Sequence, residues 1–311
     1  MGKSKGRLII FIALILILIV ACTPQKRPEQ KEPTDQEPTI SLYVAETGET
    51  KEIALEEYLY GVVAAEMDPK WPREALAAQA IIARTFTLVK IEEGGVPARG
   101  TDASTDIEEF QAYNPDRIND NVVKAVDSTR GEVARYQGKL IKTWFHADAG
   151  GKTATAEEGL GYTQSPTPFI QVVDDPGINI TVKENKNWQV SFPIAQVAKA
   201  VQEVTGQNPG NFTSAEITEK GPSGRATKIR FGQTEVSGPA LRLALGSTEM
   251  RSTLLTGLSV QGGKVVMTGK GFGHGVGMSQ WGARALAEKG KSPEEIVQYF
   301  FKDVEIVKEY K

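Results

Sequence analysis

Two helices separated by a proline-containing turn constrain this chain more than any other feature of its sequence. Residues 55–66, LEEYLYGVVAAE, place large apolar side chains at helical spacing. Residues 73–89, REALAAQAIIARTFTLV, are rich in alanine, which has the highest helix propensity. Pro69 and Pro72 lie between them, and a proline disfavours helical geometry in the residue before it. The sequence therefore predicts two consecutive helices joined by a short turn.

The apolar face of the first helix ends on an acid. Four residues after Val62, on the same face, stands Glu66, in the last turn of the predicted helix. Desolvation raises the pKa of a carboxyl group, whereas a nearby arginine lowers it, and Arg84 of the second helix could point toward Glu66. Glu66 is therefore a candidate acid, and a buried Glu66–Arg84 ion pair without chemistry is the alternative.

Residues 1–21 have the pattern of a signal peptide. Basic residues precede an uncharged apolar run from Leu8 to Ala21, which is shorter than the roughly 20 residues that span a bilayer. The run leads into Cys22 through Ile-Val-Ala, similar to a bacterial lipobox, in which cleavage leaves a lipidated cysteine. An uncleaved signal anchor is the alternative. Both predict an extracytoplasmic protein held at the outer face of the cytoplasmic membrane, and the first makes it a lipoprotein.

Composition bounds the remainder of the chain. Residues 22–39 contain four prolines, many charges and no large apolar side chain, which is typical of a semi-extended tether, so we expect the folded domain to span residues 40–311. Cys22 is the only cysteine, which excludes an internal disulfide and a thiolate metal site. The formal net charge of −3 becomes more negative without the basic signal segment, which argues against nucleic acid as a partner.

The pattern after the two helices predicts an α+β fold. Strands are expected at residues 40–44, 132–136, 139–146 and 172–173. A tight turn at Gln137-Gly138 would join two of them, and a short helix is expected at 122–126. Residues 180–246 alternate helical and strand patterns and form a possible packed lobe. We therefore expect mixed, mostly antiparallel sheets with helices packed around an open substrate groove.

A second informative segment lies near the C-terminus. Residues 269–290, GKGFGHGVGMSQWGARALAEKG, have glycine at every second position from 269 to 277. In an extended conformation one face of this segment would be bare backbone, which a ligand or another strand could approach closely. A dinucleotide site is excluded because no βαβ pattern surrounds the glycines and no acidic residue follows at the required distance.

The chain contains two histidines, and both lie in or near a glycine-containing segment. His146 ends the strand predicted at 139–146, immediately before the loop with Gly150 and Gly151, and His274 lies inside the glycine-rich segment. A hydrogen-bonded structural role is the alternative for His146. Because two histidines from separate segments are weak evidence for zinc, the sequence predicts no metal and no cofactor.

Five blocks, taken together, carry a resemblance to one family. They are EEYLYGVVAAEMDPKWPREALAAQAIIARTF at 56–86, FHADAGGKT at 145–153, SGRATKI at 223–229, VSGPALRLALG at 236–246 and GKGFGHGVGMSQWGARALAEKG at 269–290. The chain resembles the stage II sporulation protein D (SpoIID/LytB) family of peptidoglycan-acting proteins, and the blocks fall in the family's order.

This resemblance implies a lytic transglycosylase that cleaves the MurNAc–GlcNAc linkage of peptidoglycan glycan strands whose stem peptides have been removed. Glu66 corresponds to the family's catalytic glutamate. It would protonate the glycosidic oxygen and then, as carboxylate, deprotonate the muramyl 6-hydroxyl, which closes a 1,6-anhydro ring. Asp68 stands where the family often has proline, and it would raise the pKa of Glu66 if the two carboxyl groups approach each other.

The resemblance also implies a set of sugar contacts and a rival activity. The candidate contacts are His146, His274, Ser279, Gln280, Gln111, Tyr113, Arg84, Gly150, Gly151, Gly273 and Gly275. The rival is a noncatalytic glycan-binding enhancer of an N-acetylmuramoyl-L-alanine amidase, which makes a cell-wall amidase a possible partner. Some members of the family hold zinc through cysteines, which this chain lacks after Cys22.

Overall fold

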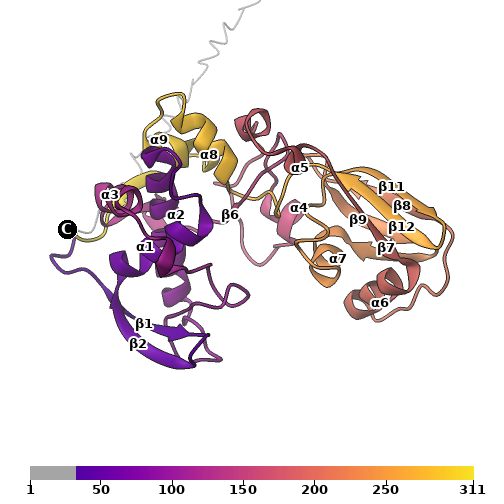
Figure 1. Ribbon diagram of the computed structural model, residues 1–311, viewed down its shortest axis with the longest axis horizontal. Helices are drawn as coiled ribbons and strands as arrows, with labels where there is room; N and C mark the ends of the chain where they lie inside the picture. Colours follow the sequence, from indigo (N-terminus) through magenta and orange to yellow (C-terminus); the bar gives the residue numbers. More distant parts are fainter. Residues whose placement is uncertain (1–32) are drawn as a thin grey trace, which may run out of the picture.

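The computed structural model describes residues 33–311 and arranges them in two lobes with separate apolar cores (Figure 1). The signal peptide expected at 1–21 and the lipidation expected at Cys22 lie outside the described residues. Within residues 33–311 no helix has the length and apolar character that crossing a bilayer requires.

The first lobe is built around the two helices that the sequence predicted. The helix α1 spans Leu55–Glu66 and α2 spans Arg73–Glu92, with Pro72 at the N-terminal boundary of α2. The small side chains of α2 let other elements approach its backbone closely, and most of its residues up to Thr87 are buried. The helices α3 (Asp120–Ser128), α8 (Gln280–Ala287) and α9 (Pro293–Phe300) contact α2, so α2 forms the centre of the lobe.

Three small sheets complete the first lobe. The strands β1 (Thr39–Val44) and β2 (Glu49–Ala54) form an antiparallel hairpin, which β3 (Ala103–Ser104) extends in parallel. A second sheet has the antiparallel order β14-β4-β5, from Glu305–Lys308, Glu132–Tyr136 and Lys139–Leu140. The third pairs β6 (Phe145–His146) in parallel with β13 (Met278–Ser279), so two distant segments meet there.

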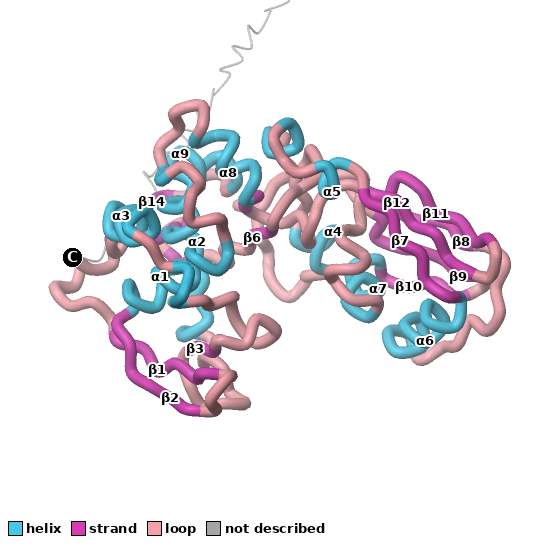
Figure 2. The backbone as a smooth tube through the Cα atoms, viewed as in Figure 1, coloured by secondary structure: helices cyan, strands magenta, loops and turns pink. Residues whose placement is uncertain are grey.

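The second lobe consists of two antiparallel sheets. One has the order β11-β12-β7, from Leu255–Gln261, Lys264–Gly269 and Trp188–Pro193. The other has the order β10-β9-β8, from Thr234–Ser237, Ala226–Phe231 and Ala215–Lys220. Figure 2 shows these strands gathered beside α6 (Ile194–Thr205), and α7 (Gly238–Ala244) contacts α6. The expected lobe at 180–246 lies in this part, whose core continues to Met267.

Short helical segments lie between the two lobes. They are α4 (Ala156–Leu160), α5 (Lys183–Lys186) and the 3-10 turn η2 (Pro176–Asn179), while a further 3-10 turn, η1 (Pro115–Arg117), precedes α3. The helices together with small, mostly antiparallel sheets confirm the expected α+β class.

Two predicted strands differ from the structure. The strand expected at 139–146 is interrupted after Leu140, because Thr143 turns inward and its hydroxyl donates to the carbonyl of Ile82 in α2 at 2.9 Å. The strand expected at 172–173 is absent, and the chain there makes a single bridge between Lys152 and Asp174. Both segments follow tertiary contacts that a local pattern does not contain.

The end of the expected tether packs on the folded domain. The backbone N–H of Thr34 donates to the carbonyl of Glu309 at 2.9 Å, which pairs this segment with the C-terminus. A carboxylate oxygen of Glu37 accepts the backbone N–H of Glu56 at 2.7 Å and so satisfies a free donor at the start of α1. Folded structure therefore begins several residues before Ile40.

Candidate active site

Glu66 is the last residue of α1, and its carboxyl group is held by two neutral donors. Its Oε1 accepts the backbone N–H of Ala112 at 3.0 Å, and its Oε2 accepts the side-chain amide of Gln280 at 3.3 Å. The side chain is half-buried. Burial raises the pKa of Glu66 above its ordinary value, and the two hydrogen bonds from Ala112 and Gln280 act in the opposite direction. Glu66 is thus biased toward a protonated acid.

Arg84 pairs with a different glutamate from the one that the sequence suggested. Its Nε and Nη2 donate to the carboxylate of Glu56 at 2.8 and 2.6 Å, and its Nη1 donates to the carbonyl of Glu132 at 2.9 Å. The guanidinium is fully buried. The proposed Glu66–Arg84 ion pair is therefore wrong, and Arg84 is not accessible to a sugar. Within residues 33–311 no lysine or arginine forms an ion pair with Glu66.

Two other acids near the site have different surroundings. Asp68 is exposed, its Oδ1 accepts the backbone N–H of Lys70 at 3.0 Å, and burial rather than Asp68 raises the pKa of Glu66. Asp175 is a second buried acid whose pKa burial raises, but it is sealed by donors from Ala149 and Ser279 and is only 2% exposed. Glu66 differs because its side chain retains partial exposure to solvent.

Buried polar and aromatic side chains support the segment that carries Ala112. The ring of Tyr113 stacks on Tyr58 with centroids 5.6 Å apart and rests on Gly61, where an added Cβ would lie 2.3 Å from the ring. Gln111 is buried, and its amide donates to the hydroxyl of Thr87 at 3.0 Å. Gln111 is therefore a structural residue, and Tyr113 is half-buried. Together these contacts hold the backbone N–H of Ala112 against Glu66.

The pairing of β6 with β13 brings Gln280 to Glu66. Ser279 pairs with His146 in this sheet, and Gln280 follows as the first residue of α8. The hydroxyl of Ser279 donates to Asp175 at 2.8 Å and accepts the backbone N–H of Gly282 at 3.1 Å. Because Ser279 is fully buried, it caps α8 and does not meet a sugar, which corrects the expectation for this residue.

The two histidines lie together at the junction of the lobes. Their ring centroids are 5.5 Å apart, and both Nδ1 atoms lie near the backbone of Val276, at 3.1 Å for His146 and 3.0 Å for His274. Burial first, and then neighbouring charged groups, lowers the pKa of His146 well below its ordinary value and that of His274 to about 3. His146 is buried and hydrogen-bonded, as in the structural alternative. No group of three His, Cys, Asp or Glu side chains in residues 33–311 is placed to hold a metal ion.

The glycine-rich segment packs against protein atoms. An added Cβ at Gly275 would lie 2.3 Å from Nη2 of Arg225, one at Gly273 would lie 2.7 Å from Cβ of His146, and one at Gly150 would lie 2.8 Å from Leu254. The φ angles at Gly273 and Gly275 are +113° and +83°, so the segment is not extended there. Of the candidate glycines, Gly151 alone has open space beside it. The extended conformation expected here is therefore wrong, and protein atoms rather than a ligand approach Gly150, Gly273 and Gly275.

Arg225 explains why Gly275 is needed. Its Nη2 donates to the carbonyl of Ala149 at 2.7 Å and its Nη1 to that of Lys152 at 2.9 Å, while its own backbone N–H donates to Glu158 at 3.1 Å. Three of the five sequence blocks, those at 145–153, 223–229 and 269–290, thus meet around one guanidinium where the two lobes join.

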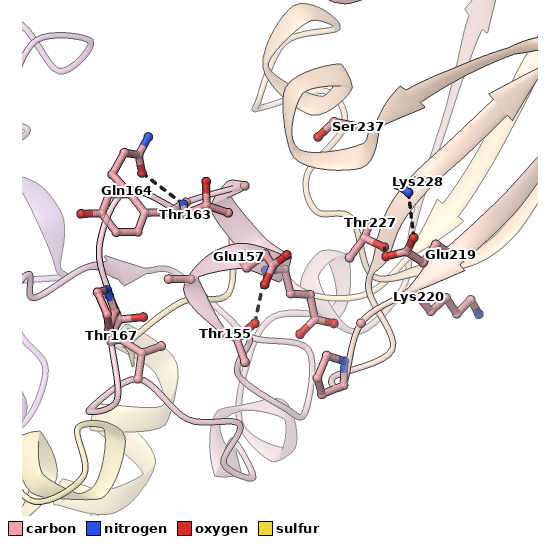
Figure 3. Close-up of a pocket in the computed structure, with 18 of the residues that line it drawn as sticks. Thr155, Glu157, Thr163, Gln164, Thr167, Glu219, Lys220, Thr227, Lys228 and Ser237 are labelled. Carbon is pink, nitrogen blue, oxygen red and sulfur yellow. Dashed lines mark hydrogen bonds and ion pairs between the residues drawn. The ribbon is translucent and has the colours of Figure 1, made fainter.

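A cleft of about 1260 Å³ lies away from Glu66, between α4 with the loop that follows it and the sheet of β8, β9 and β10. In Figure 3, Thr227 and Lys228 point at Glu219 across one wall of this cleft. Donation by Lys228 and Thr227 lowers the pKa of Glu219, so this carboxylate is not poised as an acid. The glycine-rich segment does not line this cleft.

Sequence comparisons place these features in a known family. The family model described as Stage II sporulation protein matches residues 43–136, which include α1, α2 and Glu66. A second model, described as a domain of unknown function (DUF8618), matches residues 156–277, which include the second lobe.

Relatives match across both lobes. Stage II sporulation protein D of Bacillus amyloliquefaciens is 33% identical over 291 residues, covering 88% of this chain and 81% of that protein. An uncharacterized protein of Brachyspira hyodysenteriae is 34% identical over 258 residues, covering 82% and 67%. The amidase enhancer of Bacillus subtilis is 28% identical over 289 residues, covering 78% and 39%. The resemblance carried by the five blocks is confirmed: this chain belongs to the SpoIID family, the family of stage II sporulation protein D.

Proposed function

We propose that this protein is a lytic transglycosylase that cleaves the MurNAc–GlcNAc linkage of peptide-free peptidoglycan strands, with Glu66 as its general acid and base. The observation that carries this proposal is the half-buried Glu66 carboxyl group, whose pKa is raised by burial and which forms no ion pair within residues 33–311. An acid must be protonated near the working pH to donate a proton, and a raised pKa provides that state.

In the first step the Glu66 carboxyl group gives its proton to the glycosidic oxygen. The bond between that oxygen and C1 of MurNAc breaks, and the GlcNAc hydroxyl leaves. In the second step the Glu66 carboxylate takes the proton of the muramyl 6-hydroxyl while this oxygen bonds to C1, which closes the 1,6-anhydro ring and regenerates the acid. Because the substrate supplies the nucleophile, a second carboxylate that activates water is unnecessary.

The two donors to Glu66 fit both steps. The Ala112 N–H and the Gln280 amide are neutral, so they fix the carboxyl group without the strong pKa decrease that a paired arginine would cause. When the proton has left, hydrogen bonds to a charged acceptor become stronger and stabilise the carboxylate. The site can therefore alternate between acid and base without a large rearrangement.

The N-terminal sequence supports an extracytoplasmic place of action. We propose that residues 1–21 are removed as a signal peptide, that Cys22 carries a lipid, and that the two lobes act on cell-wall glycan at the outer face of the cytoplasmic membrane.

Incubation of full-length protein in mild detergent with amidase-treated glycan strands tests the activity. Mass spectrometry should detect 1,6-anhydromuramyl ends with wild type and with the surface control Glu109→Gln, but not with Glu66→Gln. Equal product from Glu66→Gln would remove Glu66 from the mechanism.

A second candidate function is the enhancement of a cell-wall amidase by glycan binding. The observation that favours it is the 28% identity to a protein named amidase enhancer, which extends over 78% of this chain. In that case Glu66→Gln should stimulate an N-acetylmuramoyl-L-alanine amidase as well as wild type does, and neither protein should generate anhydromuramyl ends.

A further inference from the structure

Two tryptophans and an arginine form a half-buried cluster at the turn that follows Glu66. Trp71 lies in the turn between α1 and α2, and its ring centroid is 4.7 Å from that of Trp281 on α8. The guanidinium carbon of Arg284 lies 5.2 Å from each ring. We call these residues the Trp71–Trp281–Arg284 cluster, and all of them remain partly accessible.

The helix α8 connects this cluster to the acid. Its first residue, Gln280, donates to Glu66, the next is Trp281, and Arg284 follows one turn later on the same face as Gln280. Four residues of helix rise about 6 Å. The backbone positions of Gln280 and Arg284 are therefore separated by about one helical turn, which places the cluster on the turn of α8 that follows the contact between Gln280 and Glu66.

The guanidinium of Arg284 keeps its bidentate edge available. Its Nε donates to Glu288 at 2.8 Å in an exposed pair along the helix, with side chains 31% and 40% accessible. Within residues 33–311 neither Nη atom donates a hydrogen bond. Exposed pairs of this kind contribute little stability, so a ligand carboxylate can bind beside Glu288 or replace it. A planar fork is suited to a carboxylate.

We propose that the Trp71–Trp281–Arg284 cluster is a muramoyl-binding site in which Arg284 binds the lactyl carboxylate of MurNAc. This inference rests on the proposed function and names the group by which peptide-free strands are selected. Removal of the stem peptide leaves a carboxylate on the lactyl ether, whereas a strand with its peptide has a neutral amide there. A guanidinium pairs with the first and not with the second. The indole faces provide apolar surface for the sugar ring.

Binding can be measured without turnover in the Glu66→Gln background of the full-length protein. The two ligands are GlcNAc–MurNAc tetrasaccharides, one with free lactyl carboxylates and one with the same groups converted to methylamides. Calorimetry should show about tenfold tighter binding of the free acid, the effect of one charge-assisted hydrogen-bonded pair. Arg284→Gln, introduced into the same Glu66→Gln background, should abolish this preference by weakening the binding of the free acid alone. Arg284→Lys should retain part of the preference.

Two further variants separate charge recognition from stacking and from folding. Trp71→Leu should weaken the binding of both ligands by a similar factor, because stacking of a sugar ring on the indole does not depend on the lactyl group. Arg230→Gln, which removes a half-exposed, ion-paired arginine of β9, should change neither affinity. Thermal unfolding of Arg284→Gln should match its parent, since Arg284 lies at the surface of α8.

The outcomes distinguish this inference from the transglycosylase proposal. Equal weakening of both ligands by Arg284→Gln, or no weakening of either, would overturn carboxylate recognition. A wild-type protein that makes no anhydromuramyl ends, although its binding depends on Arg284 and the free carboxylate, would overturn the enzyme and leave the inference standing. If the protein with Glu66 intact cleaves both ligands equally, and Arg284→Gln does not change this, carboxylate recognition is overturned and the transglycosylase proposal stands.

Discussion

The guanidinium of Arg84 donates twice to the carboxylate of Glu56, at 2.8 and 2.6 Å, in the interior of the first lobe. The Tyr310 hydroxyl and the Gly131 N–H also donate to this carboxylate. Burial raises the pKa of Glu56, but these partners outweigh it and hold the pKa below its ordinary value. Arg84 is thus committed to the first turn of α1, and Glu66 in the last turn of the same helix is left with neutral donors.

Loss of this buried ion pair should destabilise the protein strongly. Arg84→Met leaves Glu56 charged and without its cation in the core, which should cost about 3–5 kcal/mol of unfolding free energy. The matched change Arg230→Met removes two exposed pairs, with Glu216 and Glu235, and should cost at most about 1 kcal/mol for each. Urea unfolding followed by circular dichroism measures both, and a similar small cost for the two variants would contradict the assignment of Arg84 as a core residue.

The difference in stability between the Glu66→Gln variant and wild type should depend on pH. Because the pKa of Glu66 is raised in the folded state, the folded protein binds more protons than the unfolded chain between the two pKa values, and stability falls as pH rises through that window. Glutamine does not ionise, so the variant should be more stable than wild type at about pH 8, and the difference should vanish below about pH 4.

Glu109 provides a control of opposite sign for that experiment. Donation by Arg99 and Ser104 lowers the pKa of Glu109, so Glu109→Gln should lose stability relative to wild type above the unfolded pKa. Thermal unfolding at a series of pH values resolves both trends. A Glu66→Gln variant that follows the Glu109→Gln trend would mean that Glu66 is stabilised as an anion.

Gln280 should set the pH at which activity declines. Gln280→Leu removes a hydrogen bond that lowers the pKa of Glu66, so this pKa should rise and the alkaline decline in kcat/KM should move to higher pH. Gln298→Leu removes a comparable donor, to the carbonyl of Val304, and should leave the profile unchanged. A Gln280→Leu profile with an unmoved or acid-shifted decline would show that Gln280 does not act through Glu66.

Replacement by alanine should destabilise the protein far more at Gly275 than at Gly206, a glycine of similar φ with no neighbour beside its added Cβ. Both Gly275 and Gly206 have positive φ, +83° and +73°, but only at Gly275 would the new Cβ meet a neighbour, the Arg225 guanidinium. Gly206→Ala should cost about 1 kcal/mol from φ alone, and Gly275→Ala about 1–3 kcal/mol more from overpacking. Denaturant unfolding compares the two, and equal costs would mean that Arg225 does not need this space.

Local patterns were sufficient for the helices and for the position of the acid. The apolar spacing before Glu66 and the prolines after it predicted α1, the turn and α2, because these signals lie within the segments themselves. The contact between Gln280 and Glu66 joins residues far apart in the chain, so no local pattern predicts it. The family resemblance named Gln280, but as a sugar contact rather than as a hydrogen-bond donor to Glu66.

The parts that the sequence did not predict depend on distant partners. The sequence suggested Glu66 as the partner of Arg84, and only the packing of α1 on α2 selects Glu56. The alternating glycines indicated close approach, but the identity of the approaching group, Arg225, depends on how the two lobes join. The Ala112 donor has no sequence signal because every residue except proline carries a backbone N–H.

The ionisation of the Glu66 carboxyl group can be measured directly. The protein labelled with carbon-13 at glutamate side chains can be titrated by NMR, with Glu66→Gln used to assign the Glu66 carboxyl signal. We expect a titration midpoint above the ordinary value of 4.5, because the carboxyl group is buried without a cation. A midpoint at or below that value would contradict the assignment of Glu66 as the acid.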